Sequence, residues 1–348
     1  MTALSWEPFV GCGLVPDAAL RAGIRRLCAA RLRAERASDP AEAERRHGSF
    51  VARMRTSPIA IHPADANAQH YEVPPEFFRL VLGKRLKYSA CLFESGTASL
   101  DEAEAAMLDL TCRRAGLADG QEILELGCGW GSLTLFMAER YPAARITAVS
   151  NSRDQRGFIK REALARGLAN VSVLTADMNA FEAPGVYDRV VSVEMFEHMR
   201  NWELLLSRIA RWMRPEARLF LHVFCHRTVA YPFEADEEPG ASDWMARNFF
   251  TGGLMPSERL IREFTGDVVV EEQWRVSGTH YQRTAESWLA NLDARRSEVL
   301  ALFGRIHPPA DARRRVRAWR LFFMACAELF GSSAGTEWLV SHALLRRR

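Results

Sequence analysis

The sequence of 348 residues lacks the patterns that mark several large classes of protein. Its seven cysteines include no C-x-x-C pair and are odd in number, which argues against a disulfide framework and against a structural zinc site. No apolar run follows a basic N-terminal start, and no apolar stretch approaches the length that spans a bilayer. We therefore expect a soluble protein of a reducing compartment, the cytoplasm, with no bound metal.

The chain also has little net charge. Its formal charge is +3 at pH 7, and no basic stripe with interleaved aromatics is present, so the sequence does not support nucleic-acid binding. Arginine is concentrated near the end, in residues 313–320 and 346–348. We interpret these arginines as a solvated helix face and tail. The alternative is peripheral contact with an anionic membrane, which applies only if the protein modifies lipids.

Apolar residues make up 48% of the chain, enough for a sizeable core, and their pattern changes near residue 116. Residues 1–115 are predicted to be mostly helical, and Ser99 and Glu102 form a capping box at the start of one helix. In residues 116–348 strands and helices alternate, which predicts an α/β fold with a parallel sheet covered on both faces. An acidic insert rich in glycine and aromatics, near 234–256, would lie over the pocket as a lid.

The alternation predicts seven strands and five longer helices. The predicted strands are Glu122–Leu126, Arg145–Val149, Val171–Leu174, Asp188–Val193, Leu219–Phe224, Val268–Val276 and Trp338–Leu345. The predicted helices are Leu133–Arg140, Ser152–Arg166, Trp202–Met213, Ala285–Phe303 and Asp311–Phe330. We expect the last two strands to pair like a hairpin.

The segment 123–131, with the sequence ILELGCGWG, is the strongest local signal. A short apolar strand leads into Gly127, Gly129 and Gly131, and Ser132 opens an amphipathic helix. Because glycine tolerates positive φ and lets a ligand approach the backbone, this pattern predicts a nucleotide site at the carboxyl end of a parallel sheet. The spacing G-x-G-x-G differs from the dinucleotide fingerprint G-x-G-x-x-G, which favours S-adenosylmethionine over NAD.

The next two strands should complete the cofactor site. No carboxylate follows the second strand, where many nucleotide folds bind the ribose. Asn151 or Gln155 would then serve, unless the ribose is held otherwise. The same absence disfavours an NAD-dependent oxidoreductase. After the third strand, Asp177 can accept from the adenine amino group while Met178 packs on the ring, although Asp177 could equally cap a turn.

Acidic side chains and a histidine follow the fourth strand. Glu194, Glu197 and His198 share one face if this segment is helical, at the mouth of the sheet and facing the methyl group of the cofactor. Two carboxylates and an imidazole there can raise a pKa and provide a general base or a cation site. The alternative is a solvated first helical turn in which a backbone carbonyl satisfies His198.

Other histidines follow the fifth and sixth strands. His222 and His226 lie at the end of the fifth, and His280 follows the sixth. A lone histidine at a strand end is more often structural than catalytic. Because both strand ends open toward one crevice, at least one of these histidines is a candidate member of the site.

Several motifs together resemble the cyclopropane-fatty-acyl-phospholipid synthase family of S-adenosylmethionine-dependent methyltransferases. These motifs are Tyr71-Glu-Val-Pro-Pro-Glu-Phe, Tyr88-Ser89, Leu124-Glu-Leu-Gly-Cys-Gly-Trp-Gly, Met195-Phe-Glu-His and Gly278-Thr-His-Tyr. Within the family the chain is most similar to the coclaurine N-methyltransferase branch, collinearly over nearly its whole length. The resemblance implies a Rossmann-like seven-stranded methyltransferase sheet with a helical N-terminal extension and a lid-like insert.

The resemblance also implies roles for single residues. Tyr71 and Ser89 would contact the cofactor from the N-terminal segment. Glu194, Glu197 and His198 match the side chains that N-methyltransferases place around the substrate amine. A carboxylate there makes chemical sense, because an amine must lose its proton before its lone pair can attack the sulfonium methyl.

The synthases of this family hold a bicarbonate ion as base, and part of that arrangement is present. Glu197, His222 and Tyr281 fall at matching positions, but Ala90 stands where a cysteine is expected and Cys91 follows it. In the plant N-methyltransferases, the positions of His222 and Tyr281 carry a carboxylate and a phenylalanine. The pocket is therefore a mixture, and bicarbonate binding stays open at this point.

The main hypothesis is methyl transfer from S-adenosylmethionine to the nitrogen of a small, partly aromatic amine. The second is methylene or methyl addition to an unsaturated acyl chain of a phospholipid. A third is a binding or scaffold protein that keeps the fold without catalysis, which the intact glycine turn and the polar mouth disfavour.

Overall fold

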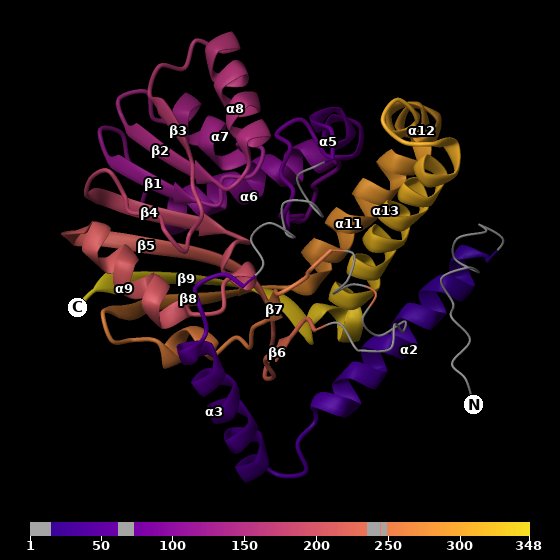
Figure 1. The fold of residues 1–348 in the computed structure, drawn as a ribbon, viewed down its shortest axis with the longest axis horizontal. Helices are drawn as coiled ribbons and strands as arrows, with labels where there is room; N and C mark the ends of the chain where they lie inside the picture. Colours follow the sequence, from indigo (N-terminus) through magenta and orange to yellow (C-terminus); the bar gives the residue numbers. More distant parts are fainter. Residues whose placement is uncertain (1–14, 62–72, 235–243, 245–248) are drawn as a thin grey trace.

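The computed structural model describes residues 15–61, 73–234, 244 and 249–348. Its centre is a seven-stranded sheet with the strand order β3-β2-β1-β4-β5-β9-β8 (Figure 1). The strands are β1 (Glu122–Leu126), β2 (Arg145–Ser150), β3 (Val171–Thr175), β4 (Tyr187–Val193), β5 (Met213–His226), β8 (Val268–Val276) and β9 (Trp338–Arg347). β1 to β5 run parallel, whereas β9 is antiparallel to both β5 and β8. The predicted α/β class and the pairing of the last two strands are confirmed.

Helices surround this sheet and extend beyond it (Figure 1). Those between parallel strands are α7 (Ser132–Arg140), α8 (Arg153–Ala165) and α9 (Trp202–Trp212). Those before the sheet are α2 (Asp17–Glu35), α3 (Pro40–Thr56), α5 (Pro75–Val81) and α6 (Leu100–Arg114), and those between β8 and β9 are α11 (Gly278–Ala294), α12 (Arg296–Gly304) and α13 (Pro309–Phe330). Shorter elements are η1 (Phe196–His198), η2 (Leu260–Glu263), η3 (Ser332–Gly335), β6 (Tyr231–Pro232) and β7 (Leu254–Met255). None of the described helices has an apolar run long enough to cross a membrane.

The strands are apolar on both faces because both faces are covered. Along β5, Leu219 and Leu221 join the apolar cluster beneath α9. Phe220, which points the other way, joins Ile123 and Val191 in the cluster beneath α6 and α7. Such two-sided burial is the usual reason why parallel strands read as continuous hydrophobic runs. It also leaves the carboxyl ends of β1 to β5 as the edge where polar side chains gather.

One predicted helix needs correction and one cap is confirmed. The expected helix Ala285–Phe303 begins seven residues earlier, at Gly278, where Ser277 accepts a hydrogen bond from the N–H of Thr279. It is broken at Arg295, whose N–H returns to Asn291 before α12 begins. At the start of α6, Ser99 and Glu102 form the predicted capping box.

The described N-terminal helices contact the C-terminal ones. α5 packs on α11 and α12, and α2 lies along α13 (Figure 1). Ion pairs hold α2 in place: Arg21 contacts Glu286 and Glu328, and Arg320 contacts Asp17. Most of the predicted insert near 234–256 lies outside the described residues.

Candidate active site

The glycine turn leaves β1 with three residues in the left-handed region. Gly127, Gly129 and Gly131 have φ values of 82°, 51° and 80°. A Cβ on Gly127 would come within 2.7 Å of the Met195 side chain, so that position needs glycine for space as well as for conformation. At Gly129, by contrast, no atom lies within 4 Å of the Cβ position. The backbone of Gly129 is therefore open to a ligand.

Two cavities meet at this turn. The first lies along the ends of β2 and β3 and includes Asn151, Asp177 and Met178 among its lining residues, together with His198. The second is lined by Lys87, Ser89, Trp130 and Ser132, among others. Four residues line both cavities: Gly127, Gly129, Gln155 and Glu194. Gly131 lines neither cavity, and it instead forms the N-cap of α7. Tyr71 lies outside the described residues.

Within the part of the chain that the structure describes, the first cavity offers an unpaired polar group to a ligand. The hydroxyl of Ser150 donates to Oε1 of Gln155 at 2.6 Å, which fixes the orientation of that amide. Its Nε2 is buried and has no hydrogen-bond partner among the described residues, so a donor is left for a bound ligand. Asp177 caps a turn, because its Oδ1 accepts from the N–H of Asn179, and it also lines the cavity, so its contact with adenine stays a prediction.

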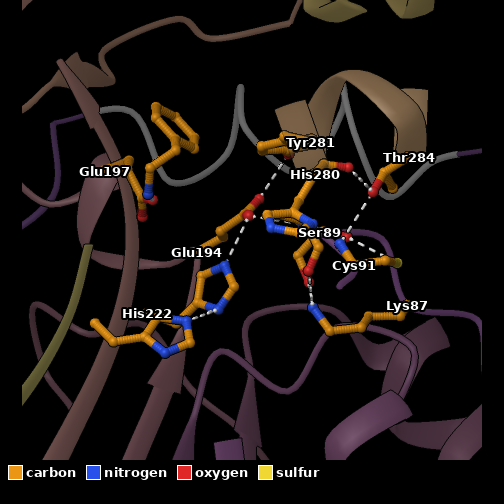
Figure 2. A network of polar contacts seen from close by, with 12 residues as sticks. Lys87, Ser89, Cys91, Glu194, Glu197, His222, His280, Tyr281 and Thr284 are labelled. Atoms are coloured by element: carbon orange, nitrogen blue, oxygen red, sulfur yellow. Dashed lines mark hydrogen bonds and ion pairs between the residues drawn. The ribbon is translucent and has the colours of Figure 1, made fainter. Parts of the chain in front are cut away.

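Glu194 is the centre of the polar network at the mouth of the sheet (Figure 2). Its N–H donates to the carbonyl of His222, and its own φ is 48°, a conformation that is strained for a residue other than glycine. The carboxylate accepts three hydrogen bonds: Oε1 from the N–H of Ala90 at 2.9 Å and from Nε2 of His222 at 3.2 Å, and Oε2 from the hydroxyl of Tyr281 at 2.8 Å. The side chain is only 8% exposed.

A buried lysine balances this buried carboxylate. Lys87 is 2% exposed, and its Nζ donates to Oγ of Ser89 at 2.5 Å and to the carbonyl of Ala90 at 2.8 Å. Burial raises the pKa of Glu194 above its ordinary value, and the positive charge of Lys87 is the largest effect that opposes this rise. Burial likewise lowers the pKa of Lys87.

Glu197 lies apart from this network, so the prediction of a shared helical face is wrong. The segment forms only the short 3-10 helix η1, and Glu194 precedes it. Oε1 of Glu197 accepts from the N–H of Phe224 at 2.7 Å, while its buried Oε2 has no hydrogen-bond partner in the described part of the chain. Burial and the neighbouring charge of Glu194 raise the pKa of Glu197 well above its ordinary value. Three donors contact the carboxylate of Glu194, so a negative charge is better stabilised on Glu194 than on Glu197.

The four candidate histidines have different partners, and His222 is hydrogen-bonded to Glu194. The His198 ring stacks on Phe250 with centroids 5.5 Å apart, and burial lowers its pKa to about 4, so this ring is neutral. The alternative of a solvated turn is wrong, because Glu197 is fully buried. His222 joins the Glu194 network, whereas His226 pairs with Glu337 and His280 accepts from the N–H of Phe93.

Bicarbonate does not fit this arrangement. The donors that would hold the ion, the N–H of Ala90, His222 and the hydroxyl of Tyr281, already converge on the carboxylate of Glu194. Cys91 turns away, with its N–H on Oγ1 of Thr284. A second anion here would be placed against an existing negative charge in a buried site, which is strongly unfavourable. The carboxylate of Glu194 occupies the position where these donors would otherwise hold the ion.

Sequence reasoning missed three charged or polar residues around Glu194. Lys87 is buried between α5 and α6, His342 is fully buried in β9, and Arg114 ends α6. A polar residue inside an apolar strand is the signal that could have found His342, whereas Lys87 follows Lys84 and Arg85 and has no such signal.

Comparisons with known proteins show the family of this chain. The family model described as mycolic acid cyclopropane synthetase matches residues 60–336. (S)-coclaurine N-methyltransferase from Thalictrum flavum subsp. glaucum is 39% identical over 340 residues, covering 97% of this chain and 93% of the relative. Cyclopropane mycolic acid synthase 1 from Mycobacterium tuberculosis is 28% identical over 78% of this chain and 95% of the relative.

Solved structures give the same order of similarity. A crystal structure of coclaurine N-methyltransferase bound to N-methylheliamine and SAH superposes with a TM-score of 0.94 at 37% identity, covering 98% of both chains. The cyclopropane synthase MmaA2 from Mycobacterium tuberculosis shares the fold, with a TM-score of 0.70 at 23% identity over 83% of this chain and all of that one. The chain belongs to the mycolic acid cyclopropane synthetase family and is an S-adenosylmethionine-dependent methyltransferase.

Proposed function

We propose that this enzyme methylates the nitrogen of a small, partly aromatic amine. The observation that carries the proposal is the carboxylate of Glu194, which lines both cavities and is held by three donors without a paired cation in direct contact among the described residues. A buried carboxylate in that position attracts an ammonium group and can take its proton. The relatives named as coclaurine and pavine N-methyltransferases support an amine of the benzylisoquinoline type.

The cofactor residues follow from the two cavities. The backbone at Gly127 and Gly129 and the side chain of Ser89 would hold the methionine portion, with Gly131 supporting the turn from behind. Asn151 and Gln155 would hold the ribose, while Asp177 and Met178 would contact the adenine. Tyr71, which belongs to the predicted set, would add a contact from the N-terminal segment. The bound cofactor supplies an electrophilic methyl group on a positively charged sulfur.

In this proposal the described side chains accept one proton from the substrate and hold the carboxylate that accepts it. Glu194 accepts the proton from the substrate ammonium, and the freed lone pair forms the new nitrogen–carbon bond as the sulfur–carbon bond breaks. Tyr281 and His222 keep the carboxylate fixed while it changes charge. Oε2 of Glu197, which has no hydrogen-bond partner among the described residues, would be a second polar contact for the amine, and the neutral ring of His198, stacked on Phe250, would form part of the wall.

A direct product assay tests the proposal. The purified protein is incubated with S-adenosylmethionine and either heliamine, the unmethylated form of the compound bound in the relative, or vesicles of unsaturated phospholipid. We expect a gain of one methyl group on the amine by mass spectrometry and no change in the acyl chains. Product formed only from the vesicles would overturn the proposal and establish acyl-chain modification instead.

A further inference from the structure

A row of side chains crosses the sheet from the candidate active site toward its edge. In the strand register, Val193 of β4 is opposite His222 of β5, and His222 is opposite His342 of β9. His342 is in turn opposite Trp274 of β8, the last strand of the sheet. Glu194 directly follows Val193. Both histidines are completely buried.

Hydrogen bonds join this row into one chain that ends at an arginine. Nη1 of Arg114 lies 2.7 Å from Nδ1 of His342, Nε2 of His342 lies 2.9 Å from Nδ1 of His222, and Nε2 of His222 lies 3.2 Å from Oε1 of Glu194. The guanidinium group of Arg114 also lies over the ring of Trp274, at 4.8 Å from its centroid. Arg114 is only half-buried, so the chain runs from near the surface to the candidate base.

The chemistry of the two ends sets the direction of every bond. A guanidinium group only donates, so Nδ1 of His342 must be the acceptor and cannot carry a proton. The neutral His342 then has its proton on Nε2 and donates it to Nδ1 of His222. His222 is left with its proton on Nε2, which it donates to the carboxylate of Glu194. One tautomer of each ring satisfies all three contacts.

The surrounding charges keep both rings neutral. Burial lowers the pKa of His222 and of His342 well below the ordinary value, and the positive charges of Lys87 and Arg114 lower both further. Several titratable groups face Glu194 itself besides its coupled neighbour Glu197: His222, Lys87, His198, Tyr281, Cys91 and Cys326. No other carboxylate accepts from the two rings among the described residues, so only Glu194 carries the negative charge at the end of the chain.

We propose that Arg114 and His342 are positioning residues that act through His222, fixing its proton on Nε2 and so holding Glu194 as the hydrogen-bonded anion that methyl transfer requires. This role rests on the proposed function of Glu194. The histidines are donors in this arrangement, and the proton taken from the amine leaves by way of the cavity rather than through the sheet. Without Arg114 or His342, His222 is free to adopt the other tautomer and to turn an acceptor toward the carboxylate.

The tautomers can be read directly, without substrate, from the ring nitrogens of ¹⁵N-histidine-labelled protein. We expect His222 and His342 to be neutral with the proton on Nε2 at pH 7, and the loss of signals in His222→Gln and His342→Gln assigns them among the nine histidines. In Arg114→Leu and His342→Leu the His222 signal should shift toward that of the Nδ1-protonated tautomer, or toward an average of the two tautomers in exchange. An unchanged His222 tautomer in these variants would overturn the proposal, whatever the substrate of the enzyme is.

The pH dependence of kcat/KM then tests the consequence for catalysis. Loss of a donor to the charged carboxylate raises the pKa of Glu194, so the acid limb of kcat/KM should move up by about one pH unit in Arg114→Leu and His342→Leu. At pH values below that pKa, kcat/KM should fall about tenfold, and at higher pH it should change little. His342→Gln, whose amide nitrogen can replace Nε2 as donor, should restore the wild-type profile. Arg113→Leu, on the neighbouring exposed arginine that pairs with Asp109, is the matched control and should change nothing.

A loss of activity that is equal at all pH values, with an unshifted acid limb, would show a structural role only and refute the positioning role. If His342→Leu does not fold, Arg114→Leu and His342→Gln still decide the question, because Arg114 is half-buried on a helix end and its replacement leaves both strands unchanged.

Discussion

Replacing Glu194 with glutamine removes one negative charge with little change of shape, and it tests the centre of the proposed site. The structure shows how the amide can be accommodated. Its oxygen can take the place of Oε1, which accepts from the N–H of Ala90 and from His222. Its NH₂ then lies where Oε2 was and can donate to the hydroxyl of Tyr281, since a hydroxyl group both donates and accepts.

The magnitudes follow from this exchange. All three contacts survive in weaker, neutral form, so we expect a loss of folding stability of about 1–3 kcal/mol, the difference between charged and neutral hydrogen bonds summed over the site. Turnover should fall much further, by about 10²- to 10⁴-fold, because a positioned general base is removed. Binding of S-adenosylmethionine should weaken only modestly, since its proposed contacts lie mainly in Gly127, Gly129, Gln155 and Asp177, and Glu194 adds only the attraction of its charge to the sulfonium.

The assay is the initial rate of amine methylation between pH 6 and 10, with thermal melting and calorimetric cofactor binding measured on the same samples. Residual activity of Glu194→Gln should keep rising with pH toward the pKa of the amine, because the free amine then needs no base. Glu328→Gln is the control, a largely buried glutamate on α13 that pairs with Arg21 and Arg25 far along the chain from the glycine turn. A Glu194→Gln enzyme that folds, binds cofactor and keeps a third of wild-type turnover at pH 7 would refute the reasoning.

Four further outcomes follow from the same geometry. Gly129→Ala should lower stability by about 1–2 kcal/mol for its left-handed φ and weaken cofactor binding at least tenfold in calorimetry, whereas Gly120→Ala, equally left-handed and open, should show only the stability loss. Glu197→Gln should reduce kcat tenfold or more if its orphan Oε2 contacts the amine, and near-normal turnover would exclude it from the mechanism. Lys87→Met should move the acid limb of kcat/KM upward, since Lys87 lowers the pKa of Glu194, so the defect should be larger at pH 7 than at pH 9; an unshifted limb would contradict this. Glu194→Gly should relieve the positive-φ strain and leave three converging donors, so added formate or bicarbonate should restore part of its activity; the absence of any rescue would argue that the anion alone is not the missing part.

The sheet could be predicted from the sequence because its signals are local. β1 and β8 have the predicted bounds, and the other strands differ from prediction mainly by extending at one or both ends. These segments are apolar runs between turn residues, and burial on both faces makes the run continuous. The glycine turn was equally readable, since its three positive φ values require the residue type that the sequence shows.

The candidate site was harder to predict because it depends on the pairing register of the strands and on the unusual φ value of Glu194. Glu194 adopts a left-handed conformation with its N–H bonded to His222, which ends β4 and turns its side chain away from that of Glu197. A spacing rule for helices cannot anticipate such a residue. The contact between His222 and His342 arises only because β9 inserts between β5 and β8, so residues 120 positions apart become direct neighbours.

The strained backbone at Glu194 suggests why an amine is the natural acceptor for this pocket. A left-handed residue other than glycine costs free energy, and here the cost is offset by three hydrogen bonds to one carboxylate. Tethering the base to the chain places a permanent negative charge beside the methyl donor. The carboxylate stabilises a bound ammonium group by its negative charge and then accepts its proton. An uncharged acyl chain gains no such binding free energy from the carboxylate. The same donors around a mobile ion would leave the pocket neutral when the ion departs, so the covalent attachment of the base is itself the feature that selects a cationic substrate.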